Sequence, residues 1–269
     1  MILSAMTAGA MAAGMHRWVA ENLRSIASIM IILVAWEAAT WLKLTPPLFL
    51  PSVAAVVATL AEVIADGSLP LDLAVSLYRT FAGLALATLL GVALGIAMAR
   101  SALMRWLLDP LVALGFPAPK IAFIPIFILW FGIESASKIL LVAFACVFPV
   151  VIATYDAASS VNRTIIWSAL SLGSSRVRLT WRIILPACYP RIFAALRVAV
   201  PVALITTFTC EMVAGGGGMG ATLMYAQRFF ESPTVFAYIV TMLAVGLIFD
   251  KAMLALRDHF PAWREDSGR

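Results

Sequence analysis

The sequence predicts an all-α integral membrane protein with six transmembrane helices. Hydrophobic residues make up 63% of the 269 residues and charged residues only 12%, whereas a soluble domain usually carries about 25% charged residues. The apolar stretches are continuous and do not alternate with polar residues, which favours helices over a transmembrane barrel. The net charge of +5 is explained by Lys and Arg in cytoplasmic loops, so no nucleic acid partner is expected.

Six apolar stretches are long enough to cross a bilayer as helices, and they cover residues 25–42, 74–99, 111–131, 139–157, 192–213 and 235–254. Two basic residues, Arg17 and Arg24, precede the first stretch. A proline-rich segment and an amphipathic stretch over 52–64 follow it, and the sequence Asp-Gly-Ser-Leu-Pro at 66–70 ends that stretch with turn residues.

The second and third stretches carry residues that shape helices. Gly91 and Gly95 of the second lie four residues apart, a spacing that allows close helix packing. The third contains Pro117, Pro119 and Pro125, each of which removes a backbone donor. We therefore expect a kinked or partly unwound helix that faces the protein core or a transport pathway, because irregular backbone is not tolerated against lipid.

The distribution of basic residues sets the orientation. With the N-terminus inside, fourteen of the nineteen Lys and Arg residues fall in inside segments or in the inner part of a stretch, four fall in outside segments or the outer part of a stretch, and Lys120 lies within the third stretch. The positive-inside rule places the N-terminus, the loop over 159–190 and the C-terminus in the cytoplasm. No basic region precedes the apolar start of the chain, so a cleaved signal is not expected, and Met15 is an alternative start to Met1.

The loop over 159–190 is a polar, arginine-containing interruption of the apolar sequence. Two short helices joined near Gly173 would form a compact knob, because glycine permits a sharp turn, and Pro186 is expected to stop the second helix before the next span. An apolar edge and a basic edge on this knob suit a groove on a partner protein. They would equally suit an amphipathic segment lying on anionic lipid, and the residues alone leave both interpretations open.

Residues 167–186 resemble the EAA loop, the signature of ABC-importer permeases. That signature reads Glu-Ala-Ala, three residues, Gly, nine residues, Ile, one residue, Leu-Pro. The matching positions are Ala169, Gly173, Ile183, Leu185 and Pro186. Trp167 and Ser168 depart from the pattern, since they stand where the glutamate and the first alanine belong. The segments 50–52, 76–83, 125–132, 137–139 and 211–213 are also similar to the sulfonate/taurine/nitrate permease subgroup.

The resemblance implies a type I ABC importer permease fold in a bacterial inner membrane. It implies a homodimer with the pathway at the subunit interface, a separate cytoplasmic ABC ATPase and an external substrate-binding protein. The domains would be a cytoplasmic segment 1–24, a permease domain 25–257 that contains the coupling loop 159–190, and a cytoplasmic tail 258–269. The residues expected to couple to the ATPase are Trp167, Ser168, Ala169, Leu170, Gly173, Arg176, Arg178, Ile183, Leu185 and Pro186.

The chain itself is not expected to be an enzyme. It has no Gly-x4-Gly-Lys-Ser/Thr phosphate loop, so ATP and magnesium would be bound by the partner ATPase and this chain would hold no cofactor. The substrate would be a sulfonate-, taurine- or nitrate-like anion or a related nutrient. A secondary transporter not coupled to ATP is the alternative, but neither inverted repeats nor a relay of charged residues in the spans is clear.

Ionisable residues and prolines in the spans are the pathway candidates. They are Lys120, Pro119, Pro125 and Glu211. Glu211 would face a substrate gate or form a cap and pair at the interface, and Lys120 would line the pathway or extend to the cytoplasmic face. Glu37 is expected to pair within the helix bundle and Arg79 to be an interfacial anchor, although an anionic substrate would be attracted to it.

Overall fold

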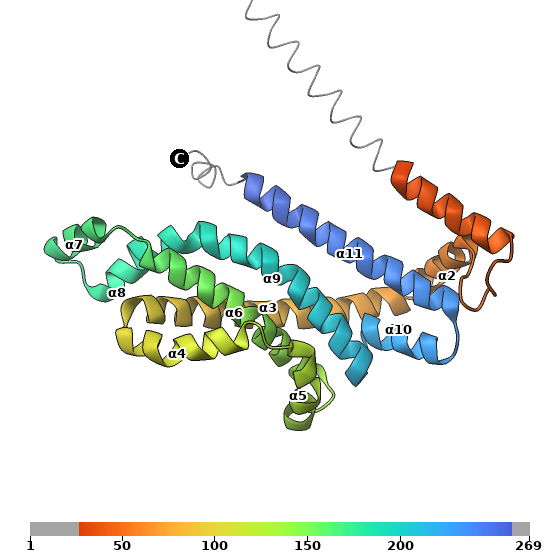
Figure 1. The fold of residues 1–269 in the computed structure, drawn as a ribbon, viewed down its shortest axis with the longest axis horizontal. Helices are drawn as coiled ribbons and strands as arrows, with labels where there is room; N and C mark the ends of the chain where they lie inside the picture. Colours follow the sequence, from red (N-terminus) through yellow and green to blue (C-terminus); the bar gives the residue numbers. More distant parts are fainter. Residues whose placement is uncertain (1–26, 260–269) are drawn as a thin grey trace, which may run out of the picture. The chain divides into compact units, whose positions relative to one another are not determined.

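The computed structural model describes residues 27–259, with side chains as far as residue 257, and every regular element in this range is a helix. Figure 1 shows these helices with their labels. The alternative start at Met15, the N-terminal segment 1–24 and the end of the tail lie outside the described residues. The chain forms two compact units, one from residues up to 62 together with 226–237, the other from 63–225 and 238 onward.

Four helices in the described range are long and apolar enough to cross a membrane. They are α3 (Ser68–Arg100), α6 (Ser135–Ser159), the continuous run Arg176–Ala214 and α11 (Ser232–His259). A fifth crossing arises if the bent pair formed by α4 (Ala102–Gly115) and the segment Lys120–Phe131 spans the membrane together. The all-α membrane fold is confirmed, whereas the described part of the first expected span, Ala27–Trp41, is too short for a full crossing.

The core of the second unit lies where α3, α6 and α9 (Leu185–Ala214) meet. Its buried residues are mostly small, and they include Leu84, Ala87, Val142, Ala145, Cys146, Ala199 and Ala203. Gly83, Gly91 and Gly95 line the face of α3 that packs on α6. A Cβ atom at Gly91 would lie 2.7 Å from the Cβ of Val150. These distances confirm that the glycines of α3 serve close helix packing.

The third expected span is broken into two arms. α4 is followed by the 3-10 turn η1 (Lys120–Phe123) and by α5 (Ile124–Phe131), and the arms enclose a bend of 100°. Pro117 and Pro119 lie in the break, where neither can donate a backbone hydrogen bond. The ammonium group of Lys120 donates to the carbonyls of Gly115, at 2.9 Å, and Phe116, so it caps the end of α4.

The expected kink or partial unwinding is therefore confirmed, whereas the expected start at residue 111 is wrong. α4 begins at Ala102, where the hydroxyl of Ser101 accepts a hydrogen bond from the amide of Met104 at 3.3 Å. Pro110 is accommodated within α4. Pro125 stands in the first turn of α5, where a proline removes no helical hydrogen bond.

The first unit contains the helix Ala27–Trp41 and most of α2 (Val53–Ala65). The indole of Trp36 donates to the carbonyl of Pro51 at 2.8 Å, and its ring lies 5.2 Å from that of Phe236. Glu37 accepts a hydrogen bond from the amide of Val53 at 2.9 Å. Glu37 thus caps the first residue of α2, where a helix N-terminus favours a negative charge.

Candidate functional site

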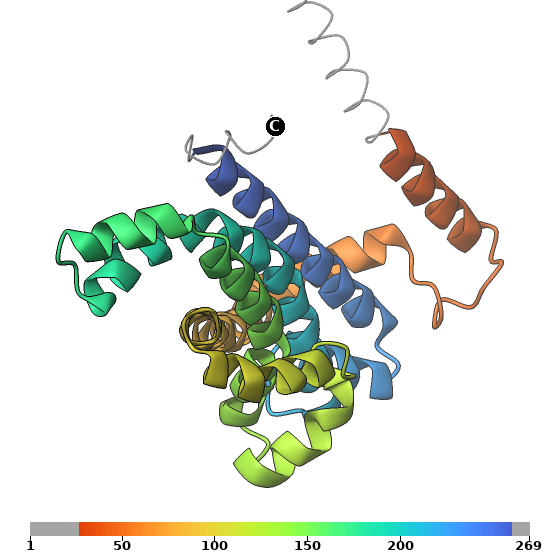
Figure 2. The ribbon, with the colours of Figure 1, turned by 60° about the vertical axis from the view of Figure 1, so that its left-hand side comes forward.

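The loop that interrupts the apolar sequence folds into a helical hairpin. α7 (Arg163–Ser171) is followed by α8 (Arg176–Leu179), and both project from the rest of the second unit in Figures 1 and 2. The side chain of Asn162 accepts from the amide of Thr164 at 2.8 Å and starts α7. The two short helices expected around Gly173 are thereby confirmed.

Gly173 ends α7 in a left-handed conformation, with φ +81°. Its amide donates to the carbonyl of Leu170, and the amide of Ser174 donates to that of Ala169, each at 3.0 Å. This pair of hydrogen bonds is the Schellman motif, which satisfies the last carbonyls of a helix and favours glycine at the left-handed position. The structure therefore gives a local reason for glycine at this position.

The expectation that Pro186 stops the second hairpin helix is wrong. α8 continues through a π-helical segment, η2 (Thr180–Ile184), directly into α9, and Pro186 lies in the first turn of α9. The amide of Leu185 donates to the carbonyl of Thr180, five residues earlier. The π segment shifts the hydrogen-bond register just before the proline, which has no amide hydrogen to donate. Pro190 is likewise inside α9, so this helix starts seven residues before the expected 192.

The residues of the EAA-like pattern divide into two groups by exposure. Ala169, Ile183 and Leu185 are half-buried and pack against the buried cluster that includes Leu179 and Ile184. The exposed members are Trp167, Ser168, Leu170, Gly173, Arg176, Arg178 and Pro186. The first group attaches the hairpin to the helix ends, and the second offers the surface available to a partner.

The exposed surface of the hairpin is apolar and basic. Trp167 is 67% exposed and Leu172 87% exposed. Residues 159–191 contain five arginines and no acidic residue. Arg100, at the end of α3, donates to the hydroxyl of Thr180 at 2.6 Å and so ties the base of the hairpin to the bundle. This contact was not foreseen, although the position of Arg100 at the end of an apolar stretch is typical of a membrane boundary.

A buried ion pair lies near the other end of α9, which at 1.5 Å per residue is roughly 45 Å long. Arg79 Nη1 of α3 lies 2.7 Å from Glu211 Oε1 of α9, and the two side chains are 3% and 0% exposed. The hydroxyl of Ser76 donates to the same carboxylate, 2.8 Å from Oε2. Burying two charges is favourable only when further hydrogen bonds satisfy them, and this pair has such partners.

The same ion pair holds the glycine-rich segment 215–220. Arg79 donates to the carbonyls of Gly216 and Gly217, each at 2.7 Å. Glu211 accepts from the amide of Gly220 at 3.1 Å, and Ser76 accepts from the amide of Met219 at 2.9 Å. The segment is thus fixed to α3 and α9 through its backbone, at the start of α10 (Met219–Arg228).

Two further charged residues border this segment. Asp72 of α3 accepts from the hydroxyls of Thr222, at 2.6 Å, and Tyr238, at 2.8 Å, and from the amide of Gly218 at 3.3 Å. Lys138, fully buried at the start of α6, donates to the carbonyls of Ile133 and Glu134. Together they extend the polar cluster around the glycine-rich segment to α6 and α11.

The structure does not bring the pathway candidates together. Glu211 bonds to Ser76, Arg79 and Gly220, whereas Lys120 bonds to the end of α4 beside Pro119. Glu211 does form a pair, with Arg79, and this pair is buried; the interpretation that Glu211 faces a substrate gate stays a prediction. The expectation that Arg79 is an interfacial anchor is wrong, since its side chain is buried. A pair of opposite ionisable residues within apolar stretches is the sequence signal that could have indicated this contact.

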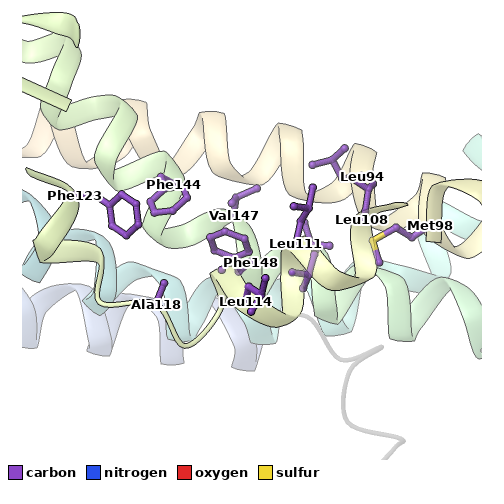
Figure 3. A pocket seen from close by; sticks show the side chains of 13 residues that line it. Leu94, Met98, Leu108, Leu111, Leu114, Ala118, Phe123, Phe144, Val147 and Phe148 are labelled. Atoms are coloured by element: carbon purple, nitrogen blue, oxygen red, sulfur yellow. The ribbon is translucent and has the colours of Figure 1, made fainter. Parts of the chain in front are cut away.

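Figure 3 shows a cavity of about 470 Å³ between α3, α4, η1 and α6. Its lining includes Met98, Leu111, Phe144 and Phe148, and none of the lining residues is charged. Neither Lys120 nor Glu211 lines this cavity. Its walls offer no partner to an anion.

Residues 87–259 match the family model of binding-protein-dependent transport system inner membrane components. The chain is 33% identical over 244 residues to the taurine transport system permease protein TauC of Escherichia coli (strain K12), with 89% of each chain covered. It is 31% identical over 234 residues to the putative aliphatic sulfonates transport permease protein SsuC of Bacillus subtilis (strain 168), which covers 87% of this chain and 85% of the relative. It is also 29% identical to the formylaminopyrimidine transport permease protein ThiX of Halalkalibacterium halodurans, over 88% of this chain and 94% of that protein.

Among solved structures, the chain is similar to one from the methionine ABC transporter MetNI in an inward-facing conformation. The TM-score is 0.56 at 14% sequence identity, and the match covers 70% of this chain and 95% of the other. At this identity the likeness concerns the fold.

Proposed function

Because the chain belongs to the family of binding-protein-dependent transport system inner membrane components, we propose that its α7–α8 hairpin is the surface through which ATP hydrolysis drives its transport. The chain is the permease subunit of an ATP-driven ABC importer and a membrane-spanning transport subunit, not an enzyme. Family membership favours this function over a secondary transporter.

The observation that carries the proposal is the construction of the hairpin. Its EAA-like residues either pack on the helix ends or lie exposed around Trp167, and the Schellman turn at Gly173 ends α7 and leads the chain toward α8. An exposed apolar surface beside several arginines suits a groove with acidic margins on an ATPase. In this arrangement Trp167, Ser168, Leu170, Arg176 and Arg178 contact the ATPase.

The same membership supports the rest of the proposed arrangement. Two copies of the chain enclose the pathway, each hairpin receives one ATPase subunit, and a substrate-binding protein delivers the solute from outside. The N-terminus, the hairpin and the C-terminus lie in the cytoplasm, as the distribution of basic residues favours. Nucleotide drives transport by binding one global state of this assembly better than the other.

Co-purification tests the assembly. The tagged chain, extracted mildly from its native membrane, is expected to carry an ATPase subunit at one copy per permease. A native mass spectrum is expected to show two identical permease chains. Consistent absence of an ATPase would contradict the hairpin assignment, and two different permease chains would contradict the homodimer.

The substrate class is proposed from the named relatives. A small anion of the sulfonate, taurine or nitrate type is favoured, because the relatives at 31–33% identity carry taurine and aliphatic sulfonate names. The assay is the ATPase rate of the reconstituted complex with its binding protein, measured with taurine, an alkyl sulfonate, nitrate or a formylaminopyrimidine. Stimulation by the pyrimidine alone would overturn the anion assignment.

A further inference from the structure

Two hollows between α9 and α11 lie along one face of α9, and together they are called the α9–α11 groove. Toward the end of α9, an apolar hollow of about 480 Å³ is lined by Pro201, Leu204 and Phe208 of α9 and by Leu243, Gly246 and Leu247 of α11. Toward its start, a second hollow of about 470 Å³ is lined by Pro190, Phe193, Ala194, Arg197 and Val198 of α9 and by Arg257 of α11. The α9 residues recur every three or four positions, so both hollows lie on the same helix face.

The two hollows differ in charge. The lining of the first is entirely apolar, whereas the second ends at two arginines, Arg197 and Arg257. No hydrogen bond or ion pair joins either arginine to another residue in the part of the chain that the structure describes. Asp250, seven residues before Arg257 on α11, lines neither hollow, and Asp258, which follows Arg257 directly, lies beyond the last side chain that the structure describes. The groove thus offers two positive charges at one end and hydrocarbon along the rest.

The length of the groove corresponds to one leaflet. Arg197 and Phe208 are eleven residues apart on α9, which is roughly 16 Å at the helical rise of 1.5 Å per residue. The hydrocarbon core of a bilayer is about 30 Å thick, so the groove runs from the region of the headgroups to about the midplane. Only 6% of the apolar window of α11 is buried within the chain, so this helix leaves the groove open along its length.

We propose that the α9–α11 groove binds an anionic phospholipid. Its phosphate contacts Arg197 and Arg257, and one acyl chain lies in the apolar hollow as far as Phe208. Basic pockets between transmembrane helices bind anionic headgroups, and arginine presents several donors to a phosphate. The proposed orientation of the chain places this lipid in the cytoplasmic leaflet, and only that placement rests on the proposed function.

Two other occupants fit this groove less well. A second copy of the chain would suit the apolar hollow but would need acidic residues opposite the arginines. A free phosphate would occupy the arginine end alone and leave the apolar hollow empty. A phospholipid satisfies both ends at once.

Native mass spectrometry of the intact transporter complex tests the proposal. The complex is taken from nanodiscs that contain equal parts of phosphatidylglycerol and phosphatidylcholine, and the retained lipids are counted. The wild type is expected to retain phosphatidylglycerol preferentially. The double variant Arg197→Gln/Arg257→Gln is expected to lower that preference roughly 25-fold, since each basic residue near a membrane surface contributes roughly a fivefold gain in affinity for anionic lipid.

Two matched variants make the result specific. Gly246→Phe is expected to reduce retention of both lipids, because no atom lies within 4 Å of an added Cβ and the ring would fill the apolar hollow. Lys251→Gln removes an exposed positive charge from the same helix outside the groove and is expected to change nothing.

Three results would overturn the proposal. One is an unchanged lipid preference in the double variant. Another is displacement of phosphatidylglycerol by soluble glycerol phosphate as effectively as by lipid, which would indicate a free phosphate site. The third is efficient cross-linking of two copies through Leu243→Cys, which would assign the groove to a second chain. The readout is lipid retention and not transport, so the proposed coupling function can fail or hold independently.

Discussion

A substitution at Gly173 tests whether coupling to the ATPase depends on the backbone shape of the hairpin rather than on its side-chain contacts. This glycine has φ +81°, and no atom lies within 4 Å of a Cβ atom built on it. The cost of a side chain there is therefore backbone strain alone, about 1–2 kcal/mol for a residue other than glycine. That strain lowers the population of the native hairpin relative to other turn geometries by a factor of roughly 5–30.

The assay compares variants in the reconstituted complex. Gly173→Val is expected to insert and assemble normally but to reduce stimulation of ATPase activity by the loaded binding protein several-fold. Gly173→Asn is expected to retain most of it, because asparagine tolerates the left-handed conformation better than other residues. Higher ATPase stimulation in Gly173→Asn than in Gly173→Val would indicate that the effect comes from backbone strain.

Gly67 provides the matched control. It has φ +83° and open space around its Cβ position, but it precedes α3 and lies outside the hairpin. Gly67→Val carries the same strain and is expected to leave coupling near the wild-type level. Equal coupling in Gly173→Val and wild type, or an equal loss in Gly67→Val, would refute the assignment of coupling to the hairpin.

Three further predictions concern the hairpin surface, the ion pair and the helix packing. Trp167→Ala is expected to weaken ATPase binding about tenfold or more, because burying a large side chain contributes roughly 1.5–3 kcal/mol; unchanged affinity in a pull-down titration would show that the indole does not dock. Arg79→Met is expected to destabilise the protein by about 3–5 kcal/mol in thermal unfolding, since it leaves the buried carboxylate of Glu211 unpaired. Adding Glu211→Gln to this variant should recover part of that loss. If the destabilisation of the double variant equals the sum of the two single effects, the two residues do not interact. Gly91→Ala is expected to lower stability by about 1–3 kcal/mol through overpacking, whereas Gly246→Ala, with no atom within 4 Å, should be neutral or stabilising; equal effects would contradict the close packing of α3 on α6.

Local features of the chain were predictable from its sequence. Continuous apolar stretches indicated α3, α6, α9 and α11, and the glycines of α3 indicated its close packing. The turn at Gly173 was also expected, because glycine readily adopts a left-handed conformation. These features depend on composition and on residues near one another in the chain.

The buried polar cluster could not be predicted in this way. Arg79 and Glu211 are 132 residues apart, and each alone is compatible with an interfacial position. Their pairing depends on how α3 packs beside α9, which periodicity does not determine. The same holds for Asp72 and its contacts with α10 and α11. For such residues, the sequence indicates only that an ionisable group in an apolar span needs a partner.

The construction of the hairpin explains which positions of the EAA-like pattern are kept. Gly173 forms the Schellman turn, and Ala169, Ile183 and Leu185 pack on the cluster at the base of the hairpin. The interval from Gly173 to Leu185 is filled by one α-helical turn and a π segment, so an insertion there would rotate these side chains off the cluster. Trp167, which departs from the pattern, is exposed and is not among the described residues that pack on this cluster. The positions that match the pattern are therefore explained by the folding of the hairpin itself. Trp167, which does not match it, lies on the exposed surface, where contacts with a partner determine which residue is suitable.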